Sequence, residues 1–370
     1  MVFTPAIFAG NPSPKTPVRV MVVDDSAVVR GLMTRWLEAA PGFDVAAVCP
    51  NGKVAVDRVK DIDPDVIVLD IEMPVMDGLT ALPQLLKASP LSKVVMASTL
   101  TRRNASETIK ALELGATDYV TKPEATTSLA GNDYQIALLN KISTLGQAVQ
   151  RRRGQDNLRS KGVQTVTRHQ LRPWTPMRPA VIAVGSSTGG PQVLRKVVED
   201  LRTTLPVPML ITQHMPKTFT TILAEHLGKL GPNPCVEAQD GMPVLSGKIY
   251  LAPGDYHMRV KKAGAGVIIK LDQSPPVNFC RPAVDPLFES VAEVFGKRTL
   301  GVILTGMGHD GLEGARIVTQ AGGQILSQDE QTSVVWGMPR AVAEAGLSGA
   351  IKPADEIAKS INTILRGEKP

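Results

Sequence analysis

Carboxylate, hydroxyl and amino side chains follow successive apolar runs in the first third of the chain. Asp24 and Asp25 end the first run, Asp70 ends the third, Ser98 ends the fourth, and Lys122 follows the fifth. Because ligands bind beyond the carboxyl ends of the strands in an open parallel sheet, we expect these side chains to meet at one edge. Three neighbouring carboxylates repel one another unless a cation joins them, and Mg²⁺ suits such an oxygen-rich site.

A cation at this edge would also change the chemistry of Asp70. By shielding the charge of an arriving phosphoryl group, it would make the Asp70 carboxylate a workable nucleophile. The hydroxyl of Ser98 and the ammonium of Lys122 could then hold the phosphoryl oxygens. The spacing therefore predicts a magnesium-dependent phosphoryl acceptor.

A glycine-rich turn at 185–191, with the sequence Gly-Ser-Ser-Thr-Gly-Gly-Pro, joins an apolar run to a predicted helix. Such a turn can cradle a phosphate or hold a serine that attacks an acyl group. A phosphate-binding loop requires Lys after its last glycine, where this chain has Pro191. A dinucleotide site requires an acid after the next strand, where this chain has Gln213 and His214. His214 is a candidate general base, so the pattern favours acyl hydrolysis.

Asp310 completes a possible triad. It lies in the segment 305–311, directly after the apolar run 300–304, so serine, histidine and aspartate all follow strands of one predicted sheet. The chain order of a triad does not matter, because triads are defined by geometry. His309 is the alternative base, but neighbours in sequence rarely form a good side-chain pair. Arg281 is kept outside the triad, where it could hold an acidic substrate or pair with Asp285.

Two series of short β-branched runs alternate with amphipathic segments. The first series predicts strands at 18–23, 44–49, 66–69, 93–96 and 118–120 and helices at 28–40, 53–60, 79–88, 107–114 and 135–150. The clearest strands of the second are 181–184, 209–212, 249–251, 300–304 and 323–326, with helices at 191–201, 220–229, 286–294, 311–319 and 354–365. This alternation predicts an α/β protein with two doubly wound parallel-sheet domains, flavodoxin-like and Rossmann-like.

The length of 370 residues accommodates these two domains. We expect a flexible extension at 1–17, a first domain at 18–153, a linker at 154–178 and a second domain at 179–370. The formal net charge is +6, and the stretch 151–178 alone carries +7. A basic excess confined to one stretch is typical of a solvated linker rather than of a nucleic-acid-binding surface, so we expect no nucleic-acid partner.

Composition excludes several further classes. No run approaches the roughly 18 apolar residues of a membrane span, so we expect no membrane insertion. Residues 1–17 contain four prolines and no basic residue before their apolar patch, which is unlike a secretory signal. The three cysteines, Cys49, Cys235 and Cys280, are widely spaced and indicate neither a disulfide framework nor a zinc site. We therefore expect a cytoplasmic protein.

The first series resembles the receiver domain of two-component response regulators over about 18–124. The motifs that carry this resemblance are Asp24-Asp25, the segment 70–74 with Asp77-Gly78, Ser98 and Lys122-Pro123. The resemblance implies that Asp70 is the phosphoacceptor and that Mg²⁺ binds at Asp24, Asp25, Asp70 and the backbone carbonyl of Glu72. It also implies that Tyr119 rotates on phosphorylation and that a chemotaxis histidine kinase supplies the phosphoryl group.

The second series resembles the catalytic domain of the CheB family of protein-glutamate methylesterases. The matching motifs are Gly-Ser-Ser-Thr-Gly-Gly at 185–190, Gln-His-Met-Pro at 213–216, Arg-Pro-Ala-Val-Asp at 281–285 and Leu-Thr-Gly-Met-Gly-His-Asp-Gly at 304–311. The resemblance implies that Ser187 rather than Ser186 is the nucleophile, with His214 as base and Asp310 as its partner. The backbone N–H groups of Thr188 and Met307 would form the oxyanion hole, and the catalytic domain would need no cofactor.

A receiver joined to this catalytic domain is that family's architecture. It implies phosphorylation-activated hydrolysis of glutamate γ-methyl esters on chemoreceptors, together with glutamine deamidation. The unphosphorylated receiver is expected to inhibit the second domain by covering the edge that carries Ser187. Two other functions stay open: a non-catalytic binding module and a DNA-binding output. The second is disfavoured because no helix-turn-helix pattern follows Pro179.

Overall fold

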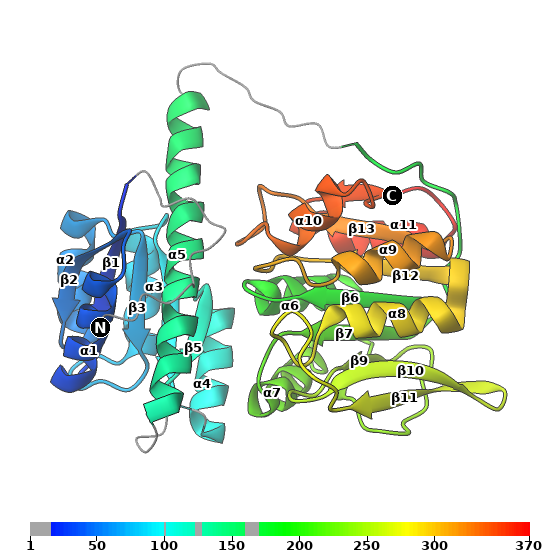
Figure 1. The fold of residues 1–370 in the computed structure, drawn as a ribbon, viewed down its shortest axis with the longest axis horizontal. Helices are drawn as coiled ribbons and strands as arrows, with labels where there is room; N and C mark the ends of the chain where they lie inside the picture. The colour runs from blue at the N-terminus through cyan, green and yellow to red at the C-terminus, as the bar shows by residue number, and fades with distance from the viewer. Residues whose placement is uncertain (1–15, 100, 123–127, 160–169) are drawn as a thin grey trace. The chain divides into compact units, whose positions relative to one another are not determined.

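A computed structural model describes residues 16–99, 101–122, 128–159 and 170–370 of the chain (Figure 1). The chain divides into two compact units, Met1–Thr165 and Val166–Pro370. Each unit has its own parallel sheet, which confirms the predicted fold class. Residues 1–15, Pro123 and the middle of the expected linker lie outside the described residues. Within the described ranges, no helix is both long enough and apolar enough for a bilayer crossing.

The first unit is a five-stranded parallel sheet in the order β2-β1-β3-β4-β5. Its strands are β1 (Val18–Val23), β2 (Phe43–Cys49), β3 (Val66–Asp70), β4 (Lys93–Ser98) and β5 (Asp118–Thr121). Its helices are α1 (Ala27–Ala39), α2 (Gly52–Ile62), α3 (Gly78–Ala88), α4 (Arg102–Glu113) and α5 (Ser128–Arg159). Every residue of β3 is buried, as expected for a central strand covered on both faces.

Polar side chains define where the helices of the first unit begin. The four residues Ser26, Asn51, Asp77 and Thr101 each accept a hydrogen bond from the backbone N–H three residues further on. These N-caps satisfy donors that the first helical turn leaves without a partner. Ser26, Asn51 and Asp77 therefore fix where the chain turns from β1, β2 and β3 into the helix that follows each strand.

The helix α5 differs from its prediction, because it begins at Ser128 and ends at Arg159 rather than covering 135–150. Its predicted apolar stripe is confirmed: Leu138, Ile142, Leu145 and Val149 are all buried. Arg153 pairs with Asp63 and Asp65 at 2.9 and 3.6 Å. The basic stretch therefore starts within the helix, because the Arg and Gln residues beyond the stripe have high helix propensity even without an apolar period.

The second unit has a seven-stranded parallel sheet in the order β14-β13-β12-β6-β7-β9-β8. The strands are β6 (Val181–Ser186), β7 (Met209–Gln213), β8 (Cys235–Glu237), β9 (Ile249–Leu251), β12 (Thr299–Ile303), β13 (Gln324–Gln328) and β14 (Ala350–Lys352). The helices are α6 (Gly190–Asp200), α7 (Lys217–Leu227), α8 (Val284–Phe295), α9 (Leu312–Gln320), α10 (Met338–Glu344) and α11 (Ile357–Leu365), with short 3₁₀ turns at Gly296–Arg298 and Ala354–Glu356.

An antiparallel hairpin, β10 (His257–Ala263) and β11 (Gly266–Asp272), was not among the predicted elements. It packs on α8, where the Val260 N–H donates to Ser290 Oγ at 3.1 Å and Met258 and Ile269 are buried in the core. The apolar alternation of these strands was not recognised in the sequence, because lysine and arginine residues lie between the apolar ones. The strands β8 and β14 and the helix α10, each of three to seven residues, were missed for the simpler reason that they are short.

Candidate active site and phosphorylation site

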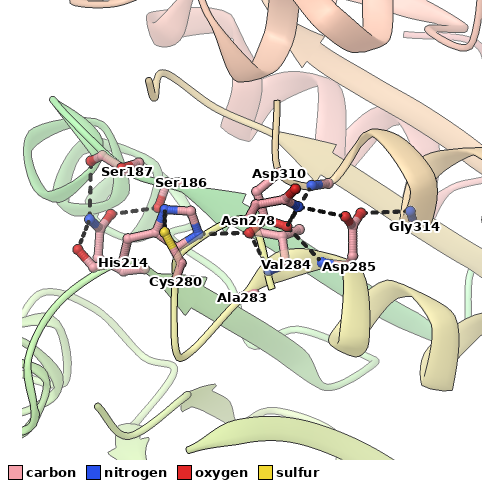
Figure 2. Close-up of polar contacts among 12 residues, drawn as sticks. Ser186, Ser187, His214, Asn278, Cys280, Ala283, Val284, Asp285, Asp310 and Gly314 are labelled. Atoms are coloured by element: carbon pink, nitrogen blue, oxygen red, sulfur yellow. Dashed lines mark hydrogen bonds and ion pairs between the residues drawn. The ribbon is translucent and has the colours of Figure 1, made fainter. Parts of the chain in front are cut away.

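The strand order of the second unit brings the three predicted triad residues to one sheet edge. The strand β6 lies between β12 and β7, and all three run parallel. Ser187 follows β6, His214 follows β7, and Asp310 lies on the loop after β12. The sequence expectation that these residues follow neighbouring strand ends is therefore met (Figure 2).

A short hydrogen bond joins two of them. His214 Nε2 lies 2.7 Å from Asp310 Oδ2, and Asp310 is almost fully buried. His309, the alternative base, is exposed to solvent. The aspartate is thus paired with the histidine that lies 96 residues away and not with its neighbour in the chain.

Several N–H donors surround the carboxylate of Asp310. The backbone N–H of Val284 donates to Oδ2 at 2.6 Å, while the N–H of Gly311 and the side-chain amide of Asn278 donate to Oδ1 at 3.0 and 3.1 Å. Burial favours the neutral acid, but the hydrogen bond and the charge of His214 outweigh it, so the pKa of Asp310 is lowered. Asp310 is therefore held as an anion in one orientation.

The second nitrogen of His214 faces a thiol. Nδ1 lies 3.4 Å from Cys280 Sγ. Burial of the imidazole lowers its pKa, but the hydrogen bonds to Asp310 and Cys280 more than compensate, and the pKa of His214 is raised. With Asp310 on Nε2, Nδ1 is the nitrogen that is left to exchange a proton with a substrate or a nucleophile.

Burial distinguishes the two adjacent serines. Ser186 is fully buried, and its hydroxyl donates to Gln213 Oε1 at 2.7 Å. Ser187 is partly exposed at the turn that leads into α6. Two residues further on, Gly189 has a φ of 76°, a left-handed conformation that favours glycine. Within the described residues, no hydrogen bond joins Ser187 Oγ to His214.

The loop after β12 lies directly against the Ser187 turn. The Ser187 N–H donates to the carbonyl of Thr305 at 3.0 Å, and Thr305 Oγ1 donates to the carbonyl of Thr188 at 2.9 Å. A Cβ on Gly306 would lie 2.9 Å from the Cβ of Ser187, so only glycine allows this approach. The segment that contains Met307 and the turn that contains Thr188 are therefore neighbours.

Three side chains make contacts in the site that were not predicted from sequence. Asn278 donates to both Asp310 and Asp285, Cys280 contacts His214, and Gln213 Nε2 donates to the Ser187 carbonyl at 3.0 Å. Nothing in the local sequence marks Asn278 or Cys280 except their place just before the motif 281–285. Of the two roles considered for Arg281, the pairing with Asp285 is wrong, because the guanidinium binds Asp255 instead.

In the first unit, the predicted carboxylate cluster is present. One oxygen from each of Asp24, Asp25 and Asp70 lies within 4.8 Å of the others. Lys122 Nζ lies 2.7 Å from both Asp24 and Asp70. Burial and the Asp24 charge raise the pKa of Asp70 to about 6, against the opposing effect of Lys122. Carboxylates gathered in this way are the donor set that a hard divalent cation requires.

The remaining residues predicted for this site occupy its surroundings. Ser98 ends β4, one residue after Ala97, which pairs with Asp70 on β3. Its hydroxyl donates to the carbonyls of Thr99 and Asn104 at 3.2 and 3.4 Å. Glu72 lies on the loop that follows β3, with an exposed side chain. Tyr119 is buried on β5, and Lys141 Nζ lies 5.3 Å from its ring centroid.

Family comparisons agree with this division of the chain. The family model of CheB methylesterases matches residues 182–361, and that of response regulator receiver domains matches residues 20–131. A protein-glutamate methylesterase/protein-glutamine glutaminase of Rhodospirillum rubrum is 49% identical, with 92% of this chain and 94% of that protein covered. One from Rhodopseudomonas palustris is 47% identical, with 98% of both chains covered. This chain belongs to the CheB methylesterase family.

The order of the two CheB family regions in the chain is that of the two compact units, with the receiver first. Among solved structures, the CheB methylesterase catalytic domain of Thermotoga maritima is 39% identical, with a TM-score of 0.49. It covers 50% of this chain, and 98% of that domain is matched.

Proposed function

We propose that this chain hydrolyses γ-methyl esters of glutamate side chains on chemotaxis receptors, and deamidates glutamine at the same sites, under control of phosphorylation at Asp70. The hydrogen bond between His214 Nε2 and Asp310 Oδ2 is the observation that carries the proposal. It places an oriented imidazole at the sheet edge that also bears the partly exposed Ser187. The names of the relatives supply the substrate class.

In the proposed mechanism, Ser187 Oγ attacks the ester carbonyl and gives its proton to His214 Nδ1, while Asp310 holds Nε2. This step requires that, with bound substrate, Ser187 Oγ replaces Cys280 Sγ as the partner of His214 Nδ1, since catalytic hydrogen bonds commonly form only in the substrate complex. The backbone N–H groups of Thr188 and Met307 hold the tetrahedral oxyanion. The C–O bond breaks, methanol leaves with the proton from His214, and water then hydrolyses the acyl-enzyme in the same way.

For the receiver, we propose that Asp70 accepts a phosphoryl group from a chemotaxis histidine kinase. Asp24, Asp25, Asp70 and the backbone carbonyl of Glu72 would hold Mg²⁺, which shields the negative charge that gathers during phosphoryl transfer. Lys122 neutralises the carboxylates, and Ser98 binds a phosphoryl oxygen. Rotation of Tyr119 then reports the phosphorylated state and relieves inhibition of the esterase. A cytoplasmic location follows from this partnership with the kinase.

The decisive experiment measures methanol release from methylated receptor, with and without acetyl phosphate and Mg²⁺. We expect release that rises with the phosphodonor. Release that does not respond to the phosphodonor would keep the esterase and reject the regulation. No release in either condition would reject the enzyme and favour a binding module.

Removal of residues 1–153 should raise basal release, and unchanged or lower release would contradict inhibition by the receiver.

A further inference from the structure

A tight turn at 277–280 stands beside the His214–Asp310 pair. The Val277 N–H donates to the Cys280 carbonyl at 3.1 Å, and the Cys280 N–H donates back to the Val277 carbonyl at 2.9 Å. Asn278 and Phe279 form the tip of the turn, with φ values of 51° and 63°. The residues before and after Phe279 in the chain both contact the catalytic pair: Asn278 binds Asp310, and Cys280 contacts His214.

Phe279 itself points into solvent. Its relative exposure is 103%, the highest among the exposed large apolar side chains of the described residues, and it is the only aromatic ring among them. An exposed phenyl ring forgoes the hydrophobic stabilisation that burial would give. A left-handed φ is in addition unfavourable for a bulky residue, whereas asparagine or glycine adopts it readily.

Packing within the domain therefore does not explain why Phe occupies this position. A ring held on a turn that is hydrogen-bonded at both ends loses little conformational freedom when it binds a partner. Aromatic side chains of this kind commonly serve as anchors at protein interfaces. The ring is thus suited to contact another polypeptide.

We propose that Phe279 is a docking residue that anchors the polypeptide substrate beside the catalytic pair. This inference rests on the proposed function. The contacts of Asn278 and Cys280 identify the partner: a protein whose side chain reaches His214 and Asp310 must approach next to the turn that touches both. The partner is therefore an apolar surface of the protein that carries the methyl ester, close to the modified glutamate.

The test compares Phe279→Asn with Phe279→Tyr in the full chain. Asparagine keeps the left-handed turn and removes the ring, whereas tyrosine keeps the ring. Each variant is assayed on methylated receptor and on N-acetyl-glutamate amide γ-methyl ester, which carries the scissile ester but no protein surface that could bind the anchor.

For Phe279→Asn we expect KM for the receptor to rise roughly tenfold, with kcat within about twofold, because a well-placed interface anchor contributes a factor of this order. Hydrolysis of the small ester should not change, and Phe279→Tyr should behave like the wild type on both substrates.

Three outcomes would overturn the proposal. An unchanged KM for the receptor means that the ring does not dock substrate. Equal losses on receptor and small ester mean that the turn acts by positioning His214 and Asp310. A gain on both substrates without phosphodonor means that the ring instead contacts the receiver. Hydrolysis of the small ester by the wild type and its loss in Ser187→Ala would show that the proposed esterase chemistry holds even where the docking role fails.

Discussion

The carboxylates of Asp285 and Asp310 accept hydrogen bonds from the same nitrogen, Nδ2 of Asn278, at 3.0 and 3.1 Å. The two acids respond in opposite directions to sharing a buried site. The hydrogen bond to His214 outweighs the effect of burial and lowers the pKa of Asp310, whereas burial and the charge of Asp310 raise the pKa of Asp285 to about 6. Asp310 thus remains charged next to His214, and the repulsion between the two carboxylates raises the pKa of Asp285 instead.

Replacing Asp285 with Asn should alter the pH dependence of stability. A carboxyl with a raised folded-state pKa stabilises the fold below its unfolded pKa, near 4, and this stabilisation is lost as pH rises through about 6. Asparagine does not titrate. The free energy of unfolding of Asp285→Asn should therefore improve, relative to the wild type, by about 1 kcal/mol between pH 5 and pH 7.5. Urea titrations of both proteins at pH 5 and at pH 7.5 measure this difference. The same change in the free energy of unfolding between the two pH values in both proteins would contradict it.

Ser187→Ala should reduce kcat for ester hydrolysis by as much as about 10⁶-fold, because the acyl-enzyme can no longer form. Ser186→Ala is the matched control. Its hydroxyl is buried against Gln213, so we expect activity within roughly tenfold of the wild type. Methanol release and labelling by a serine-directed fluorophosphonate both report the result. A Ser187→Ala enzyme within tenfold of the wild type would exclude Ser187 as nucleophile.

His214→Ala should lose activity by a similar factor, since members of a triad act as one unit. His309→Ala should stay close to the wild type, because its side chain is exposed and Asp310 pairs with His214. The comparison of kcat in the two variants decides which histidine is the base. The reverse ranking would transfer that role to His309.

Gly306→Ala tests the close approach between the loop after β12 and the serine turn. The new methyl group would meet the Cβ of Ser187 at 2.9 Å and the sulfur of Met338 at 2.2 Å. A displacement of the nucleophile by a fraction of an ångström to one ångström should cost about 10²-fold in kcat. Gly266→Ala, on the hairpin with no atom nearer than 3.7 Å, is the control. Equal activity of the two variants in methanol release would show that the approach is not needed.

Asp70→Asn should abolish the rise in esterase activity that acetyl phosphate and Mg²⁺ produce, because an amide does not accept a phosphoryl group. Asp57→Asn, an exposed position on α2 that pairs only with Lys53 at 2.6 Å among the contacts described, should retain the rise. The ratio of methanol release with and without phosphodonor is the readout. A retained rise in Asp70→Asn would place the phosphoryl acceptor elsewhere.

The elements that could be predicted from sequence are those with a strong local pattern. The wholly buried strands β3 and β6 were predicted because they read as continuous apolar runs. The hairpin β10–β11 and the extra length of α5 were missed, because neither has an uninterrupted apolar period. Tertiary packing on α8 and helix propensity, respectively, decide them.

By itself, the sequence determined that carboxylates and a lysine end strands of one parallel sheet, and that Ser187, His214 and Asp310 end strands of another. Periodicity and turn residues are local, and parallel strands necessarily place their carboxyl ends at one edge. Only the tertiary structure decided that Asp310 binds Nε2 of His214, that Ser186 is buried while Ser187 is not, and that Arg281 pairs with Asp255. These relationships depend on side-chain rotamers and on contacts between residues that lie far apart in the chain, which local sequence patterns do not specify.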